Sequence, residues 1–224
     1  MAEAQAASPA AAAAKAALPD LALACGMACL AGATDVCGLL RLRDLFVSFM
    51  SGNTTMLGVA LGHGDWKRAG LIAGVVGLFV TGAAAGAVLG TLAGRWHMPA
   101  VATAVAAVLC VPLLYPDWMP WALTLAMGML NAAISRVSGV SVGLTYVTGT
   151  LVKLGQGIGH ALLGRGGWAW ALQAPLWLSL LAGAVAAGAA QWTGQEPPWP
   201  LPVLAAALAA AALAHELRHV GDGE

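Results

Sequence analysis

The sequence predicts an all-α fold, a polytopic bundle of transmembrane helices, and two observations lead to this prediction. Of the 224 residues, 60% are hydrophobic and only 9% are charged, whereas soluble domains carry roughly 25% charged residues. Long Ala/Leu/Gly-rich stretches also follow one another with short breaks, and they lack the period-two alternation of a membrane barrel. So few charges could not cover a soluble surface, but lipid can solvate an apolar exterior.

The chain is expected to open with a disordered Ala-rich tail at residues 1–19, because this tract lacks the basic start and short apolar core of a signal peptide. A single transmembrane domain at 20–217 and a polar tail at 218–224 follow. A helix needs about 20 apolar residues to cross a membrane. By this criterion eight elements are expected, at 20–40, 44–62, 69–94, 98–115, 118–138, 141–163, 168–192 and 199–217.

The breaks between these elements hold most of the charged residues and many tryptophans, as expected at a membrane–water interface. Ten basic and ten acidic residues cancel, so there is no basic surface for nucleic acid. The expected surroundings are the lipid bilayer. Gly-rich helix faces, above all a small-residue ladder that begins at Gly82, favour close packing of helices and suit a homo-oligomer.

Two elements carry polar clusters at their centres. The second contains Ser51, Gly52, Asn53 and Thr54, and the sixth contains Thr148, Gly149 and Thr150. Polar groups at mid-membrane depth are tolerated where they face protein or a wet cavity. We therefore expect six continuous spans and two broken polar elements.

These two elements also indicate an internal repeat. Met50–Asn53 aligns with Val147–Thr150, and the preceding helices share Gly32-x-x-Asp35 and Gly128-x-x-Asn131. The chain then divides into similar halves at 20–116 and 117–217. If the polar elements cross the membrane the halves are parallel, and if they enter and return the halves are inverted. We favour elements that cross, hence eight crossings and parallel halves.

The motifs Gly32-x-x-Asp35, Phe46–Thr54 and Tyr146–Leu151 together resemble the YoaK family of bacterial membrane proteins. The resemblance covers nearly the whole chain after the tail. It implies a multi-pass protein of the bacterial inner membrane, of a kind often labelled a permease. The family label itself supplies no mechanism.

Asp35 is the strongest single candidate for a functional residue. It lies in the first span with apolar residues on both sides, where an ionised carboxylate would be costly. The functional interpretation is a carboxylate that couples transport to a proton or cation. The alternative is a carboxylate near a helix end that is satisfied by Arg41 or Arg43.

The polar clusters form the second candidate site. Ser, Asn and Thr cap helix N-termini, and a helix that starts at such a cluster would aim free N–H groups at an anionic or carbonyl-bearing solute. The partners that could add hydrogen bonds are Asn131, Thr145 and Tyr146. The alternative is that these residues only hold helices together.

Two strings resemble catalytic motifs, and neither indicates an enzyme. Residues 215–219 match the H-E-x-x-H zinc pattern, but the supporting third ligand of a catalytic zinc is missing from the pattern. Residues 139–143 match G-x-S-x-G, which works on a strand-to-helix turn that this chain does not offer. We expect no cofactor and no catalytic activity.

The best function on these grounds is permeation or secondary transport of an unknown small solute at a midplane site between the halves. The alternatives are a non-transporting sensor or assembly protein and, more distantly, an intramembrane hydrolase. Transport predicts a hydrated midplane cavity, and a structural role predicts a dry, filled interface. Either topology places both termini on one side of the membrane, and we expect the cytoplasmic side.

Overall fold

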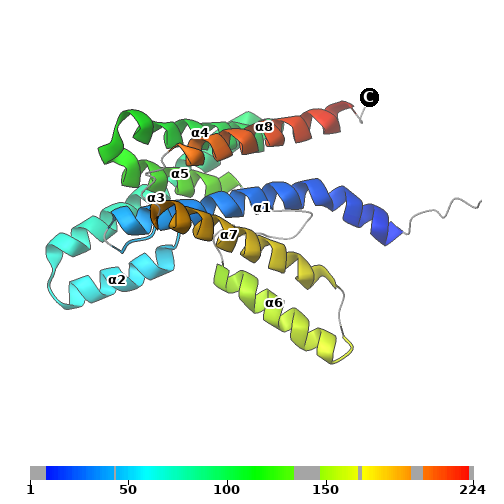
Figure 1. Cartoon of the computed structure of the whole chain (residues 1–224), viewed down its shortest axis with the longest axis horizontal. Helices are drawn as coiled ribbons and strands as arrows, with labels where there is room; N and C mark the ends of the chain where they lie inside the picture. The colour runs from blue at the N-terminus through cyan, green and yellow to red at the C-terminus, as the bar shows by residue number, and fades with distance from the viewer. Residues whose placement is uncertain (1–8, 43, 134–146, 166–167, 193–198, 222–224) are drawn as a thin grey trace, which may run out of the picture.

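The computed structural model describes residues 9–42, 44–133, 147–165, 168–192 and 199–221. The regular elements in these ranges are all helical (Figure 1), so the predicted all-α class is confirmed. Each expected element coincides with one helix, and the eight are α1 (Pro9–Arg41), α2 (Met50–Gly62), α3 (Trp66–Ala93), α4 (His97–Leu114), α5 (Met119–Ala133), α6 (Val147–Leu162), α7 (Gln173–Trp192) and α8 (Pro200–Gly221). Short 3-10 turns precede α4, α5 and α7, at Gly94–Trp96, Pro116–Trp118 and Trp168–Leu172.

Four stretches are long and apolar enough to cross a membrane. They are Leu18–Arg41, Trp66–Leu114, Trp170–Ala190 and Pro200–Arg218. The second stretch covers both α3 and α4, which the turn at Gly94 separates with a φ of 56°. These four candidates come from the described residues alone, and α5 is described over 15 of its expected residues.

The expected disordered tail is in part helical, because α1 begins at Pro9. The physical reason lies in composition. Alanine has the highest helix propensity of all residues, and proline is tolerated in the first helical turn, where its missing N–H has no partner in any case. Residues 1–8 lie outside the described part of the chain.

The second element departs from the expected crossing. Only Met50–Gly62 is helical, and 13 residues rise about 20 Å, less than the ~30 Å of a hydrocarbon core. The Ser51–Thr54 cluster therefore lies in the first turn of α2 and not at the centre of a broken span. In Figure 1, α1 and α2 run in the same direction and α3 runs back, so residues 44–49 return part of the way along the bundle before α2 begins.

The expectation of parallel halves is not met either. In Figure 1, α1 and α5 run in opposite directions across the bundle, and so do α4 and α8. The start of the first span and the end of the last lie at the same end of the bundle. There the Asp20 carboxylate of α1 lies 2.8 Å from Nε2 of His215 of α8.

The packing of the helices follows one pattern twice. Helix α1 packs on α7 while α5 packs on α3, and α2 packs on α3 while α6 packs on α7. Similarly, α4 packs on α5 while α8 packs on α1. Two further contacts, α1 with α5 and α4 with α8, join corresponding helices directly. The contact of α3 with α4 has no counterpart in this pattern. The corresponding helices, α7 and α8, do not pack closely over their described residues.

Glycines make the two tightest crossings possible. A Cβ on Gly32 of α1 would lie 2.0 Å from the carbonyl oxygen of Leu180, and one on Gly183 of α7 would lie 1.9 Å from that of Cys29. At the α3–α5 crossing, Gly82 and Gly128 stand in the same relation to the Leu125 and Phe79 carbonyl oxygens, at 2.3 and 2.2 Å. The ladder expected from Gly82 onward therefore serves close backbone packing.

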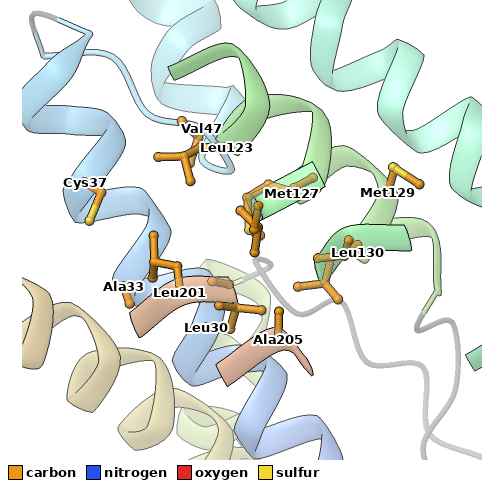
Figure 2. Close-up of a cluster of buried hydrophobic side chains, with 14 of the residues drawn as sticks. Leu30, Ala33, Cys37, Val47, Leu123, Met127, Met129, Leu130, Leu201 and Ala205 are labelled. Atoms are coloured by element: carbon orange, nitrogen blue, oxygen red, sulfur yellow. The ribbon is translucent and has the colours of Figure 1, made fainter. Parts of the chain in front are cut away.

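The core is apolar and lies where α1, α4, α5 and α8 meet. Figure 2 shows Leu30 of α1, Met127 and Leu130 of α5, and Ala205 of α8 in one cluster. All four side chains are at most 2% exposed. This cluster joins α1, α5 and α8 in one core.

Candidate functional site

Asp35 holds a buried, non-helical segment against α1. Its Oδ1 accepts hydrogen bonds from the backbone N–H groups of Val47 (3.0 Å) and Ser48 (2.8 Å). Its Oδ2 accepts a short hydrogen bond from the Ser48 hydroxyl. The carboxylate thus satisfies two backbone donors that no helix or strand satisfies, which buried backbone requires.

The held segment is the return of the chain after α1. Asp44 begins it with a φ of 69°, a left-handed conformation that aspartate tolerates. Leu45 and Val47 are fully buried, and Ser48 is 4% exposed. Gly38 of α1 makes room, because a Cβ there would lie 2.4 Å from Cγ1 of Val47. We call residues 44–49 the return segment.

Asn53 holds the same segment from the other side. Its side-chain oxygen accepts from the Phe46 N–H (3.0 Å), and its amide nitrogen donates to the Phe46 carbonyl oxygen (2.7 Å). Gly52 leaves space for the Phe49 ring, since a Cβ there would lie 2.6 Å from its Cδ1. Phe49 in turn packs edge-to-face on Phe46, with ring centroids 5.3 Å apart.

The other residues of the first cluster face outward. Ser51 and Thr54 are exposed, and the Thr54 hydroxyl donates to the Met50 carbonyl oxygen within α2. The N-terminus of α2 has Phe49 at its cap position, and no side chain caps it. The structure therefore brings Asp35 and Asn53 together on one segment and leaves Ser51 and Thr54 outside this cluster.

The second cluster lies at the start of α6. Thr148 is exposed, and Gly149 and Thr150 are partly buried in the first turn. Asn131 on α5 donates to the Met127 carbonyl oxygen of its own helix at 2.8 Å. Thr145 and Tyr146 lie outside the described residues. The predicted midplane site between the two halves thus stays a prediction.

Sequence reasoning missed two residues of the site. Ser48 lies within the quoted motif but was not singled out, although it completes the Asp35 contacts. Thr34 is fully buried, and its hydroxyl oxygen lies 2.9 Å from the Leu30 carbonyl oxygen and 3.0 Å from Sδ of Met127 on α5. The only available signal was a polar residue inside an apolar stretch.

One crevice between the described helices is too small for water. It is lined by residues of α1, α4, α5 and α8. Its lining is entirely apolar, with Met27, Leu30, Val105 and Leu130 among the residues. This crevice is not the hydrated cavity that transport predicts.

The H-E-x-x-H string lies in the last turns of α8. His215 of the H-E-x-x-H string pairs with Asp20, and the described residues contain no group of three or more potential metal ligands. Arg41 is exposed, and the Asp35 carboxylate is satisfied by Val47 and Ser48 as described above. The G-x-S-x-G string, residues 139–143, lies outside the described residues.

Taken together, the apolar helices, the buried return segment and the lipid-compatible exterior define a multi-pass α-helical membrane protein. Comparison with known proteins agrees with this class. Residues 23–214 match the family described as protein of unknown function DUF1275, and the chain belongs to this family. It is also 40% identical over 168 residues to a UPF0700 transmembrane protein of Rhizobium meliloti, covering 74% of this chain and 73% of that protein.

No solved structure matches the chain. The resemblance seen in the sequence is thus confirmed as membership of an uncharacterised membrane-protein family. The narrower YoaK name stays a prediction.

Proposed function

We propose that this protein is a small-solute permease or secondary transporter of the bacterial inner membrane. One observation carries the proposal. The return segment is non-helical, with Leu45, Val47 and Ser48 buried, and it is held by the side chains of Asp35 and Asn53. Non-helical backbone at membrane depth occurs where it is buried in protein or lines a water-filled path, and transporters build solute sites from such interrupted elements.

The arrangement of the halves supports the same proposal. We take residues 20–116 and 117–217 as an inverted repeat, because corresponding helices run in opposite directions and pack in the same pairs. Inverted repeats allow alternating access by the rocking of one group of helices against another. The glycine crossings suggest which groups move as units, namely α1 with α7 and α3 with α5.

In this mechanism the return segment opens and closes the solute path, and Asp35 holds it in the closed position. An ionised carboxylate only accepts hydrogen bonds, whereas a protonated one also donates. A change of proton or cation occupancy at Asp35 would therefore alter the hydrogen bonds that it accepts from Val47 and Ser48. The filled crevice at the bundle centre then corresponds to a closed conformation.

The second candidate function is a non-transporting sensor or assembly protein. Two observations favour it, namely the filled centre and the commitment of Asp35 and Asn53 to backbone hydrogen bonds. In that case the polar residues only stabilise the fold.

Solute flux into proteoliposomes distinguishes the two functions. Swelling of vesicles in glycerol, in potassium acetate with valinomycin and in potassium chloride with valinomycin would be followed by light scattering, with protein-free vesicles as the blank. A permease accelerates the flux of a solute, and Asp35→Asn abolishes that acceleration while the purified variant stays monodisperse. A set of fluxes equal to the blank for all solutes, labelled rubidium included, would contradict the proposal.

A further inference from the structure

The groups that contact the Asp35 carboxylate are hydrogen-bond donors. Its Oδ1 accepts from the N–H groups of Val47 and Ser48 at 3.0 and 2.8 Å, and its Oδ2 accepts from the Ser48 hydroxyl. The return segment thus presents the positive ends of two peptide dipoles to Asp35. The carbonyl oxygen of Phe46 is engaged elsewhere, because it accepts from the Asn53 amide at 2.7 Å.

This set of partners does not suit a metal cation. Hard cations are coordinated by several oxygen atoms, and in membrane transporters unwound backbone supplies carbonyl groups for this purpose. At Asp35 the non-helical backbone supplies N–H groups instead, and these repel a cation. A metal ion that took their place at Oδ1 would leave both N–H groups buried without an acceptor, which is costly.

A proton, in contrast, has a place at Oδ2. A hydroxyl both donates and accepts hydrogen bonds, and a protonated carboxyl also donates. When a proton from the aqueous phase binds Oδ2, the new O–H group can donate to Oγ of Ser48, and the hydroxyl hydrogen of Ser48 rotates away. Oδ1 still accepts from Val47 and Ser48, but these bonds weaken, because a bond to an ionised carboxylate is roughly twice as strong as a neutral one.

Other charged or titratable groups lie apart from this carboxylate. Helices α2, α5 and α7 carry none over the ranges described, and those of α8 begin at His215, beside the start of the first span. Arg41 and Asp44, which follow Asp35 along the chain, are exposed, and the Cys37 thiol is buried on α1. Among the described residues, Asp35 is therefore the carboxyl group at which protonation acts on the hydrogen bonds of the return segment.

We infer that the ion coupled to transport is a proton carried on Oδ2 of Asp35, and that Ser48 is the residue that positions it. This inference rests on the proposed transport function and names its driving ion. Protonation weakens the hydrogen bonds from Val47 and Ser48, which favours movement of the return segment. Release of the proton restores these bonds. The movement of the solute and that of the proton are linked in this way.

Infrared spectroscopy of the full-length protein in phosphatidylcholine vesicles tests the proton site. The C=O stretch of protonated carboxyl groups is followed as the pH is varied, and the part of the signal that Asp35→Asn removes belongs to Asp35. This variant should fold, because its amide oxygen can still accept from Val47 and Ser48 and its NH₂ group can donate to Oγ of Ser48. The Asp35 signal should appear on acidification and should not change when sodium replaces choline at equal ionic strength.

Substitutions of Ser48 test its positioning role. Ser48→Ala removes the partner of Oδ2 and leaves both backbone donors in place. It should shift the pH at which the Asp35 signal is half developed by about one unit, the effect of one hydrogen bond to a charged group, whereas Ser48→Thr should keep that pH. Thr91→Ala removes an exposed hydroxyl that bonds within α3, and this matched control should leave the signal unchanged. A Ser48→Ala variant with the pH of the parent would overturn the role of Ser48.

Flux in the same vesicles separates the inference from the proposed function. Flux of one of the solutes named above that a pH gradient stimulates and Asp35→Asn abolishes would support both. Flux that follows a sodium gradient, or flux without an Asp35 signal that titrates, would leave transport standing and overturn the proton inference. A titrating Asp35 signal without flux of any of these solutes would overturn the proposed function and, with it, the coupling role of the proton.

Discussion

At the scale of single residues, Asp35 and Asn53 act on the backbone of the return segment. Between them they pair with the N–H groups of Phe46, Val47 and Ser48 and with one carbonyl oxygen. In a membrane each unpaired backbone group costs several kcal/mol. The two side chains therefore make a non-helical path possible where water is absent.

Removal of the Asp35 carboxylate should destabilise the protein. Asp35→Ala leaves the N–H groups of Val47 and Ser48 without an acceptor inside the protein, at a cost of about 1–3 kcal/mol each. Thermal unfolding of the purified protein in detergent should show a lower midpoint for this variant. Asp117→Ala, an exposed carboxylate in a surface turn, should unfold within error of the parent. An unchanged midpoint for Asp35→Ala would show that these hydrogen bonds do not stabilise the return segment.

Replacement of the Asn53 amide should lower the stability of the folded protein. Asn53→Asp keeps an acceptor for the Phe46 N–H but places a carboxylate against the Phe46 carbonyl oxygen, where the amide now donates. We expect a larger loss of stability, by the same unfolding assay, than for Thr54→Ala, whose exposed hydroxyl bonds only within α2. Equal stability of the two variants would contradict the assigned hydrogen bonds.

The sequence identified part of this site. Asp35 stands out as a charged residue in an apolar stretch, and Asn53 stands out as part of a polar cluster within one. Their partners could not be predicted, because they are backbone groups of Phe46, Val47 and Ser48, and backbone groups leave no trace in a side-chain pattern. By charge, Arg41 or Arg43 was the natural partner of Asp35. The structure shows hydrogen bonds from the returning backbone to Asp35, and Arg43 lies outside the described residues.

At the scale of helices, order and approximate bounds followed from hydropathy, and the exceptions have physical causes. Residues 44–62 form a stretch of 19 positions that is apolar apart from Asp44 and its hydroxyl and amide residues, so they were interpreted as a span. Hydropathy cannot distinguish a buried return segment followed by a short helix from one long helix, because both are equally apolar. The alanine tract before Leu18 was predicted to be disordered. It is helical from Pro9 onward, because alanine has a high helix propensity.

The glycine crossings give a prediction at this scale. Gly183→Ala places a Cβ 1.9 Å from the Cys29 carbonyl oxygen, so α7 must move away from α1, and overpacking of this kind costs about 1–3 kcal/mol. Gly188→Ala on the same helix meets nothing within 4 Å and should raise stability by about 0.5–1 kcal/mol through helix propensity. Guanidinium or thermal unfolding of both variants checks the sign of each change. A destabilising Gly188→Ala or a neutral Gly183→Ala would refute the assigned contacts.

At the scale of the whole molecule, the direction of the helices decides the topology. Repetition within the sequence indicated two similar halves, but their relative orientation depends on whether α2 crosses the membrane. An even number of crossings, six or eight, places both ends of the bundle's chain on one side, in agreement with the contact of Asp20 with His215. That contact joins residues nearly 200 positions apart in the chain, which local patterns do not reveal.

Reporter fusions test the placement of the two ends. Alkaline phosphatase and green fluorescent protein fused at either end should give the same signal, and we expect the cytoplasmic one for both. A fluorescent fusion at one end together with an active phosphatase at the other would require an odd number of crossings and would refute this topology.

The central claim is that the return segment and α2 enter the bundle and leave on the side from which they came. Cysteine accessibility at Arg41 and His63, both exposed, tests it directly in a background without the four native cysteines. A membrane-impermeant maleimide should label Arg41→Cys and His63→Cys from the same side of the membrane, and Arg165→Cys from the opposite side. Labelling of Arg41→Cys and His63→Cys from opposite sides would show that α2 crosses and would contradict the inverted arrangement.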